Sequence, residues 1–385
     1  MKNVFDFNKT GENRALIKHR FGVPLFRQYF QKSIFALLII IFSIGFASCE
    51  RTADPRTEAL MGTVCTVNAY DDGTKSLYDE LFARLHEIDE TFSVTIDSSE
   101  ISAINKAAGE RSVSVSSDTA YVVKASLAFA ELTGGAFDPT VGPLVKIWGI
   151  NTDHARVPEK SEIDAVLPLI NWRDVSVADD NTVMLKRRGM ALDLGGIVKG
   201  YAADELTKIL KARKVRRAIV DLGGNIFVYG KKKDGSPWRV GIKDPNDPEG
   251  VPAIVLNVAN STIVTSGVYE RFFTENGVRY HHILDVKTGY PAASGLLSST
   301  IVCESSMAAD ALSTSVFVLG KEGGMELLHR IQSSAGTPLA EIPGLHAQVL
   351  GIFIEEDGSV SASKALACRN VRIAVSVSNT LRLSR

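Results

Sequence analysis

One short segment, 191–204, constrains the fold more than any other part of this chain. An apolar run ends there in Asp193, turns on Gly195 and Gly196, and then opens a helix that carries Lys199. Glycine leaves the backbone uncovered, so its N–H and C=O groups can touch a ligand directly. With a carboxylate and an ammonium flanking the bare backbone, this strand-to-helix corner suits a phosphate and a metal ion together.

A second segment, 308–314, carries the oxygen ligands that such a corner lacks. On a helix, Asp310 and Thr314 are separated by one turn and share a face. A carboxylate, a hydroxyl and a backbone carbonyl from a glycine corner make an all-oxygen site, which Mg²⁺ and Ca²⁺ favour and Zn²⁺ does not. Taken alone, these two residues have an alternative explanation, in which Asp310 caps the helix and Thr314 packs in the core.

The segment 280–291 contains a candidate base. His281 and His282 are adjacent, so they point to opposite faces of an extended chain and at most one of them faces a given site. A histidine near a phosphate can act as a general base. A structural histidine is the alternative for either residue taken singly.

Two further segments are rich in turn-forming or polar residues. The segment 134–143 has glycines and prolines at high density, with Phe137 as a flat apolar surface and Asp138 as an acceptor. It suits a nucleotide or flavin base, and a helix-capping loop is the alternative. The segment 265–271, taken alone, has the composition of an ordinary polar loop between strands.

The apolar periodicity favours one α+β domain. Spacings of three and four predict helices, alternation predicts strands, and no Pro-rich linker divides the chain after the N-terminal region. A formal net charge of −1 argues against nucleic-acid binding, which needs a basic face. The predicted helices cover 77–92, 101–108, 119–133, 161–167, 197–213 and 306–319, and the predicted strands cover 61–70, 217–222, 226–229, 238–242, 253–258, 261–265, 298–303 and 347–354.

The N-terminus has the features of a secretion signal. Basic residues precede an uncharged stretch at 33–48, whose apolar core is shorter than the roughly 20 residues that span a bilayer. Phe46-Ala-Ser-Cys49 resembles a bacterial lipoprotein processing site, and an uncleaved membrane anchor is the alternative. We expect a lipoprotein signal peptide over 1–48 with lipidation at Cys49, a tether over 49–59, one main domain over 60–370 and a weakly structured tail over 371–385.

The candidate segments occur in an order that is informative as a whole. In sequence they are Met61-Gly-Thr63, the serine-containing segment 92–105, Gly135-Ala-Phe-Asp138 with Val141-Gly-Pro-Leu144, 193–200, Leu222-Gly-Gly-Asn225, Thr265-Ser-Gly267, His282-Ile-Leu-Asp285 with Thr288-Gly289, and 309–314. Together they resemble the FAD:protein FMN transferases, the ApbE family, over 60–320. One departure is that Val286 follows Asp285, where the family usually has proline.

The resemblance implies a T-fold-like α+β domain of two subdomains, with FAD extended between them and Mg²⁺ at its pyrophosphate. His282 would be the general base, and Asp310 would be needed for catalysis as well as for metal binding. The implied FAD contacts are Met61, Ala136, Phe137, Asp138, Asp193, Lys199 and Leu284. The implied metal ligands are the backbone oxygen of Gly196 and the side chains of Asp310, Ser313 and Thr314.

The resemblance also implies a reaction and partners. The family transfers FMN from FAD to a threonine hydroxyl of a target protein through a phosphoester bond and releases AMP. Its targets are extracytoplasmic flavin-carrying subunits of redox-driven ion pumps, and the enzyme would be lipid-anchored at the bacterial cell membrane, facing the periplasm. An FAD pyrophosphatase would use the same residues with water as acceptor. A non-catalytic FAD-binding lipoprotein would need no metal, so Asp310 and Thr314 argue against it.

Overall fold

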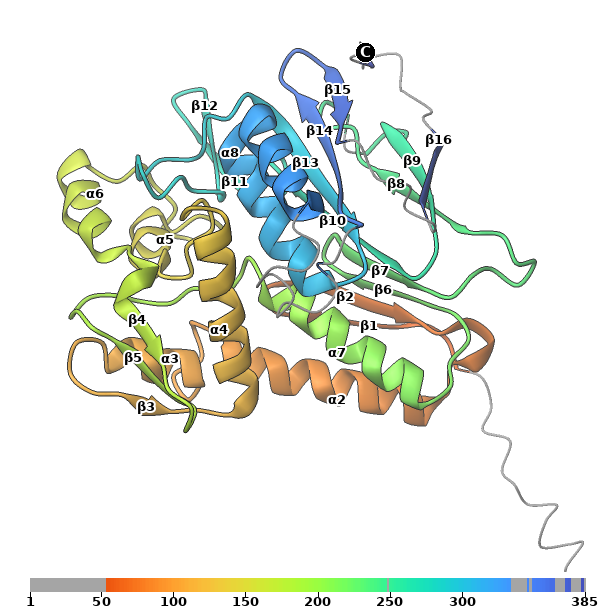
Figure 1. The fold of residues 1–385 in the computed structure, drawn as a ribbon, viewed down its shortest axis with the longest axis horizontal. Helices are drawn as coiled ribbons and strands as arrows, with labels where there is room; N and C mark the ends of the chain where they lie inside the picture. The colour runs from red at the N-terminus through yellow and green to blue at the C-terminus, as the bar shows by residue number, and fades with distance from the viewer. Residues whose placement is uncertain are drawn as a thin grey trace, which may run out of the picture. The chain divides into compact units, whose positions relative to one another are not determined.

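An extended antiparallel sheet forms the centre of the computed structural model, which describes residues 53–247, 249–333, 345, 348–363, 371–374 and 382–383 (Figure 1). These residues belong to one compact unit, Thr52–Arg385. Within the described ranges the sheet has nine strands, and every neighbouring pair is antiparallel except β15 and β17. Their order is β1 (Arg56–Leu60), β2 (Thr63–Asn68), β6 (Ala218–Leu222), β7 (Asn225–Tyr229), β10 (Ser261–Gly267), β13 (Leu296–Cys303), β14 (Leu350–Glu355), β15 (Ser359–Ala362) and β17 (Arg382–Leu383).

Helices cover one face of this sheet (Figure 1). The helix α8 (Ser306–Ser333) packs against β10 and β13, α7 (Val198–Ala212) packs against α8 and β7, and α2 (Lys75–Phe92) packs against α7. The contact between α7 and α8 requires glycine, because a Cβ atom at Gly200 would lie 2.2 Å from the carbonyl oxygen of Ser306. At Gly320, with φ of 71°, α8 is kinked, so the helix predicted to end at residue 319 is its first half.

The opposite face of the sheet carries a second apolar core. It is covered by a three-stranded antiparallel sheet of β8 (Trp238–Ile242), β9 (Ile254–Val258) and β16 (Val371–Ala374). Side chains of β8 and β9, including Val240 and Leu256, pack with Ile263 and Ile352 of the large sheet. The second core follows from alternation, since every other residue of β9 is buried.

A smaller α/β part completes the domain. It contains the sheet β3 (Val113–Ser114), β5 (Thr182–Leu185) and β4 (Val175–Val177), the helices α3 (Glu100–Lys106), α4 (Ser117–Leu132), α5 (Gly142–Trp148) and α6 (Lys160–Val166), and short 3-10 helices at Leu167–Leu169 and Trp172–Asp174. A further 3-10 helix, Tyr70–Asp72, follows β2 and packs through Tyr70 against Trp238 of β8. Trp148, which is fully buried, donates from Nε1 to the carbonyl oxygen of Gly289 at 2.8 Å. That bond ties the smaller part to the loop after the hairpin of β11 (Phe272–Glu275) and β12 (Val278–His281). The predicted α+β class is confirmed.

Both ends of the main domain differ from the sequence-based boundaries. The strand β1 begins at Arg56, inside the predicted tether, and pairs with β2 from Arg56↔Val67 to Leu60↔Thr63. It is an edge strand in which Leu60 is the one buried residue, and its other residues are largely polar, as in a linker. The tail predicted to be weakly structured contains β16 and β17, which pair with β9 and β15. Pairing with distant strands leaves no local signal in a short segment.

The predicted signal peptide and Cys49 lie outside the described residues. Within the part of the chain that the structure does describe, no helix combines the length and the apolar character that crossing a membrane requires.

Candidate functional site

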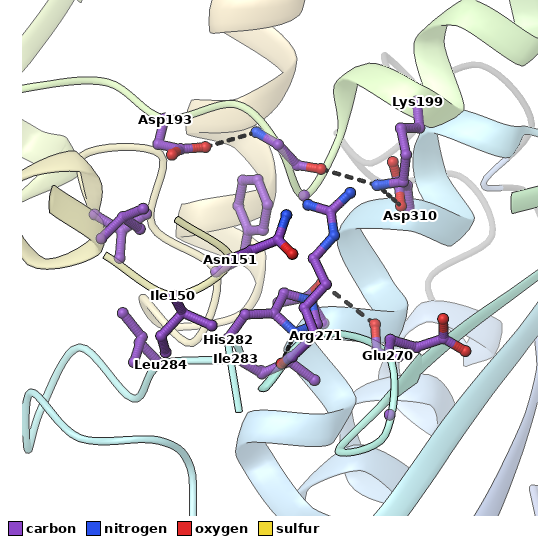
Figure 2. A pocket seen from close by; sticks show the side chains of 18 of the residues that line it. Ile150, Asn151, Asp193, Lys199, Glu270, Arg271, His282, Ile283, Leu284 and Asp310 are labelled. Carbon is purple, nitrogen blue, oxygen red and sulfur yellow. Dashed lines mark hydrogen bonds and ion pairs between the residues drawn. The ribbon is translucent and has the colours of Figure 1, made fainter. Parts of the chain in front are cut away.

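A cavity of about 440 Å³ lies where the large sheet and its helices meet the smaller part (Figure 2). Phe137, Val141 and Trp148 line it from the smaller part, while Val264 lines it from the sheet and Asp310 from α8. Ten of the residues proposed from the sequence line this one cavity: Ala136, Phe137, Asp138, Asp193, Gly196, Lys199, His282, Leu284, Asp310 and Thr314. Segments far apart in the chain therefore converge as the sequence predicts.

The glycine corner at the start of α7 forms one wall of the cavity. The Asp193 carboxylate accepts a hydrogen bond from the Gly195 N–H at 2.9 Å, and the Lys199 ammonium donates to the Gly195 carbonyl at 3.0 Å (Figure 2). A Cβ atom at Gly196 would lie 3.3 Å from the Phe137 ring and 3.7 Å from the Thr314 hydroxyl, so glycine lets these groups approach. Burial raises the pKa of Asp193, and its bond to Gly195 and the nearby positive charges oppose that rise.

Asp310 is the carboxylate that joins the two helices at the cavity. Its Oδ2 accepts from the Gly200 N–H at 3.0 Å, and its Oδ1 lies 3.4 Å from the Lys199 ammonium. Only 4% of the residue is exposed. A buried carboxylate is stable when it is paired and hydrogen-bonded, and here the first turn of α7 supplies both partners. One turn further along α8, Thr314 lines the same cavity.

Ser313 and Met61 are the two predicted site residues that do not line the cavity. Ser313 is fully buried, and its hydroxyl lies 2.9 Å from both the Asp310 carbonyl and the Ser266 hydroxyl. Helical geometry turns residue 313 about 100° away from residue 314, so Thr314 can face the cavity while Ser313 faces the sheet. Met61 packs against the main core in the tight turn between β1 and β2, and its neighbours Gly62 and Thr63 line the cavity instead.

Asp138 lines the cavity but is already occupied by the protein. Its Oδ1 accepts from the Thr140 backbone at 2.8 Å and from the Thr140 hydroxyl at 2.6 Å, while Oδ2 accepts from the Trp172 backbone at 3.2 Å. Burial raises the pKa of Asp138, and these bonds counteract the rise. The carboxylate therefore fixes the path of the loop that presents Ala136 and Phe137.

The two histidines at the end of β12 point to different surroundings, as the alternation predicts. His281 is buried against Phe317, with ring centroids 5.5 Å apart, and His282 lines the cavity. The Nδ1 atom of His282 lies 3.2 Å from the Arg271 carbonyl oxygen, which can only accept. Nδ1 therefore carries the proton, and the lone pair of Nε2 remains available as a base.

Both imidazoles are held neutral. Burial, together with the charge on Arg271, lowers the pKa of His282 from 6.5 to about 3. Burial lowers the pKa of His281 to about 4. Burial acts in the opposite direction on a carboxyl group and raises the pKa of Asp204 to about 6.

The lowered pKa values of the two histidines predict a loss of stability as the pH falls. Below pH 6.5 the unfolded chain protonates His282 and the folded chain does not, so the free energy of unfolding should decrease from pH 6.5 towards pH 3. One such proton contributes at most about 1.4 kcal/mol per pH unit. Urea unfolding at pH 7.5, 6 and 5 should show a shallower decline for His282→Gln than for the wild type. Equal declines would contradict the shift, and the opposing effect of Asp204 is common to both proteins.

Several cavity residues are absent from the predicted site, although Thr265-Ser-Gly267 and Leu222-Gly-Gly-Asn225 belong to the segments that carry the family resemblance. Thr265, Ser266, Glu270 and Arg271 all line the cavity, although their segment reads as an ordinary loop. Gly223, Gly224 and Asn225 line it as well. A usable signal exists for these three, because Asp-Leu-Gly-Gly occurs at 193 and again at 221. For Arg271 the only signal is an adjacent Glu-Arg pair after Val268 and Tyr269.

The donors that could hold a metal are all oxygen atoms. Across the described ranges, no three His, Cys, Asp or Glu side chains form a group able to bind a metal ion. The cavity instead combines the Asp310 carboxylate, the Thr314 hydroxyl and the backbone of Gly196. A site with one carboxylate suits Mg²⁺, which keeps several waters and is completed by substrate phosphates.

Comparisons with known proteins identify the family of this chain. The model of the ApbE family matches residues 61–336. The FAD:protein FMN transferase of Treponema pallidum (strain Nichols) is 37% identical over 354 residues, which cover 86% of this chain and 94% of that protein. The FAD:protein FMN transferase of Klebsiella pneumoniae (strain 342) is 34% identical over 273 residues, covering 70% of this chain and 84% of that protein.

The fold is similar to solved structures that carry the same family name. The ApbE protein from Thermotoga maritima has a TM-score of 0.69 and 33% identity, covering 80% of this chain and 96% of that chain. The flavin transferase ApbE from Vibrio cholerae has a TM-score of 0.68 and 31% identity, covering 81% of this chain and 97% of that chain. With a family match over most of its length, this chain belongs to the ApbE family.

Proposed function

We propose that this chain is an Mg²⁺-dependent FAD:protein FMN transferase. It transfers FMN from FAD to a threonine hydroxyl of a target protein, forms a phosphoester bond and releases AMP. The relatives that span most of the chain carry this name. The observation that carries the proposal is the convergence of Lys199, Asp310, Thr314 and His282 on one cavity. Such a set can bind a charged diphosphate and accept a proton.

The residues present fit Mg²⁺. Asp310, Thr314 and the backbone carbonyl of Gly196 would hold it, and the absence of a side chain at Gly196 keeps the approach to the Thr314 hydroxyl open. When bound, the ion neutralises negative charge on the phosphate oxygens. Lys199 then provides a positive charge beside the same phosphates, since it is held by Gly195 and Asp310 at the cavity wall.

The chemistry is a displacement at the phosphorus of the FMN half. The threonine oxygen forms a bond to that phosphorus, the bond from phosphorus to the bridging oxygen breaks, and AMP leaves with the electron pair of that bond. The threonine proton passes to Nε2 of His282, the ring atom left free by the bond to Arg271. Phosphoryl transfer depends mainly on positioning and charge stabilisation, and the protein groups that line this cavity supply both.

We further propose that the enzyme is lipid-anchored through Cys49 at the bacterial cell membrane and faces the periplasm. The support is the sequence of the N-terminal 1–49 alone, where an apolar stretch of signal length precedes Ala-Ser-Cys. The flavin-accepting partner would then be an extracytoplasmic subunit with an accessible threonine.

The proposal predicts covalent flavin on an acceptor protein. Purified protein, FAD, Mg²⁺ and a candidate acceptor subunit should yield a fluorescent acceptor band after denaturing electrophoresis, together with one AMP per flavin attached. An acceptor in which the target threonine is replaced by valine should stay unlabelled. Release of FMN and AMP with no labelled acceptor would contradict the transferase and favour an FAD pyrophosphatase. FAD that remains intact would contradict both activities.

A further inference from the structure

The cavity contains a second cationic side chain besides Lys199, the guanidinium of Arg271. Arg271 immediately precedes β11 and lines the cavity. Its Nη2 donates to the carbonyl oxygen of Gly62 at 3.1 Å, in the turn between β1 and β2. In Figure 2 the side chain rises from beside His282 towards the part of the cavity that holds Lys199 and Asp310.

The guanidinium has donors to spare. An arginine carries five N–H donors, and the bond to Gly62 uses one of them. Within the described part of the chain Arg271 makes no ion pair, whereas Lys199 is engaged by Asp310 and by the Gly195 carbonyl. A guanidinium with free donors and no carboxylate partner is available to bind an anionic ligand.

The backbone couples this cation to the candidate base. The carbonyl oxygen of Arg271 accepts from the His282 backbone N–H at 3.0 Å and lies 3.2 Å from His282 Nδ1. Arg271 and His282 therefore face each other at the open end of the β11–β12 hairpin. The charge of Arg271 acts on groups on both sides of the cavity. Burial lowers the pKa of His282 and raises the pKa of Asp193. The positive charge of Arg271 lowers the pKa of both groups.

We propose that Arg271 binds a phosphate group of the dinucleotide substrate beside His282. The inference rests on the proposed function, because it takes FAD as the ligand of this cavity. A guanidinium matches two phosphate oxygens with two parallel N–H donors, which the ammonium of lysine cannot do. Placed next to the base, it also stabilises the negative charge that spreads over the phosphate oxygens during transfer.

Binding of a flavin series tests the proposal without turnover. Riboflavin has no phosphate, FMN has one and FAD has two, so their affinities in Mg²⁺-free buffer separate a phosphate contact from a contact to the ring. Arg271→Met should weaken the binding of FMN and FAD by about 10- to 100-fold and leave riboflavin unchanged. Arg271→Lys should lose less, since it keeps the charge and loses the paired donors.

Arg279→Met is the matched control. Arg279 lies on the same hairpin, stacks on Phe272 with 4.4 Å from its guanidinium carbon to the ring centroid, and does not line the cavity. It removes the same charge and should leave all three affinities unchanged. If Arg271→Met is unstable by thermal melting, the ratio of FAD to riboflavin affinity in Arg271→Lys decides the question.

Two results would overturn the role of Arg271. An equal loss of affinity for riboflavin and FAD would show that Arg271 only stabilises the β1–β2 turn through its bond to Gly62. Unchanged FAD affinity in Arg271→Met would exclude the phosphate contact. Either result leaves the transferase proposal standing if the wild type binds FAD and labels an acceptor. A folded wild type that binds no FAD would instead overturn the proposed function and this inference with it.

Discussion

Replacement of Asp310 by asparagine is expected to slow FMN transfer by roughly 1000-fold, at the upper end of what losing one electrostatic group costs an active site. Asparagine keeps the shape, and its amide oxygen can still accept from the Gly200 N–H. It removes the negative charge next to Lys199 and the only carboxylate among the proposed metal donors. The fold should therefore survive while the binding of Mg²⁺ weakens.

Metal affinity and activity should fall together in this variant. Titration with Mn²⁺ followed by electron paramagnetic resonance measures metal binding without turnover, and a coupled AMP assay measures the rate. Glu322→Gln removes one negative charge from an exposed position on the same helix and should behave as the wild type. If Asp310→Asn retains both the affinity for Mn²⁺ and the rate of transfer, Asp310 is not a metal ligand and its role is limited to joining α7 and α8.

The local part of the site could be predicted from the sequence. Helix spacing places Asp310 and Thr314 on one face, and both line the cavity. Alternation separates His281 from His282 in the same way. In each case the relation depends on a few consecutive residues with a known period, so no tertiary information is required. The helix predicted over 306–319, which carries Asp310 and Thr314, was likewise set by period and agrees with the first half of α8. The predicted helix 197–213 and strand 298–303 agree with α7 and β13.

The sequence could not predict which groups the site side chains bind through hydrogen bonds. Asp138 has the chemistry of a ligand contact, but Thr140 and Trp172 use both of its oxygens, and the bond to Trp172 spans 34 residues. Arg271 has the setting of a surface loop, and its place in the cavity depends on Gly62, 209 residues away. Such contacts arise from packing, which leaves no periodic trace in either segment.

Ser313 was proposed as a metal ligand for its chemistry, and the structure places it beside the cavity lining rather than in it. A hydroxyl next to Thr314 is an attractive extra ligand, yet successive helical residues point in different directions. The Ser313 hydroxyl contacts Ser266 of β10 and the Asp310 carbonyl. The backbone carbonyl of Ser313 accepts a hydrogen bond from the Ser299 hydroxyl at 2.8 Å. Ser313 thus holds α8 against the sheet that supports the site.

Replacement of His282 by glutamine is expected to lower kcat by about 10²- to 10⁴-fold, the usual contribution of a general base. Glutamine can still donate to the Arg271 carbonyl, so the end of the hairpin should keep its shape while the proton acceptor is lost. In the free protein the pKa of His282 is about 3, held down by burial and by Arg271. An anionic diphosphate beside Arg271 and Lys199 counters their charge, so the pKa should rise in the substrate complex.

The pH dependence distinguishes a base from a structural histidine. Because kcat reports the substrate complex and kcat/KM the free enzyme, the acidic limb of the wild-type kcat profile should lie at higher pH than that of kcat/KM. His282→Gln should lack this limb. His281→Gln is the matched control, since His281 is buried behind the cavity against Phe317 and should leave the profile unchanged. Full activity of His282→Gln, or an unaltered acidic limb, would show that another group accepts the proton of the threonine hydroxyl.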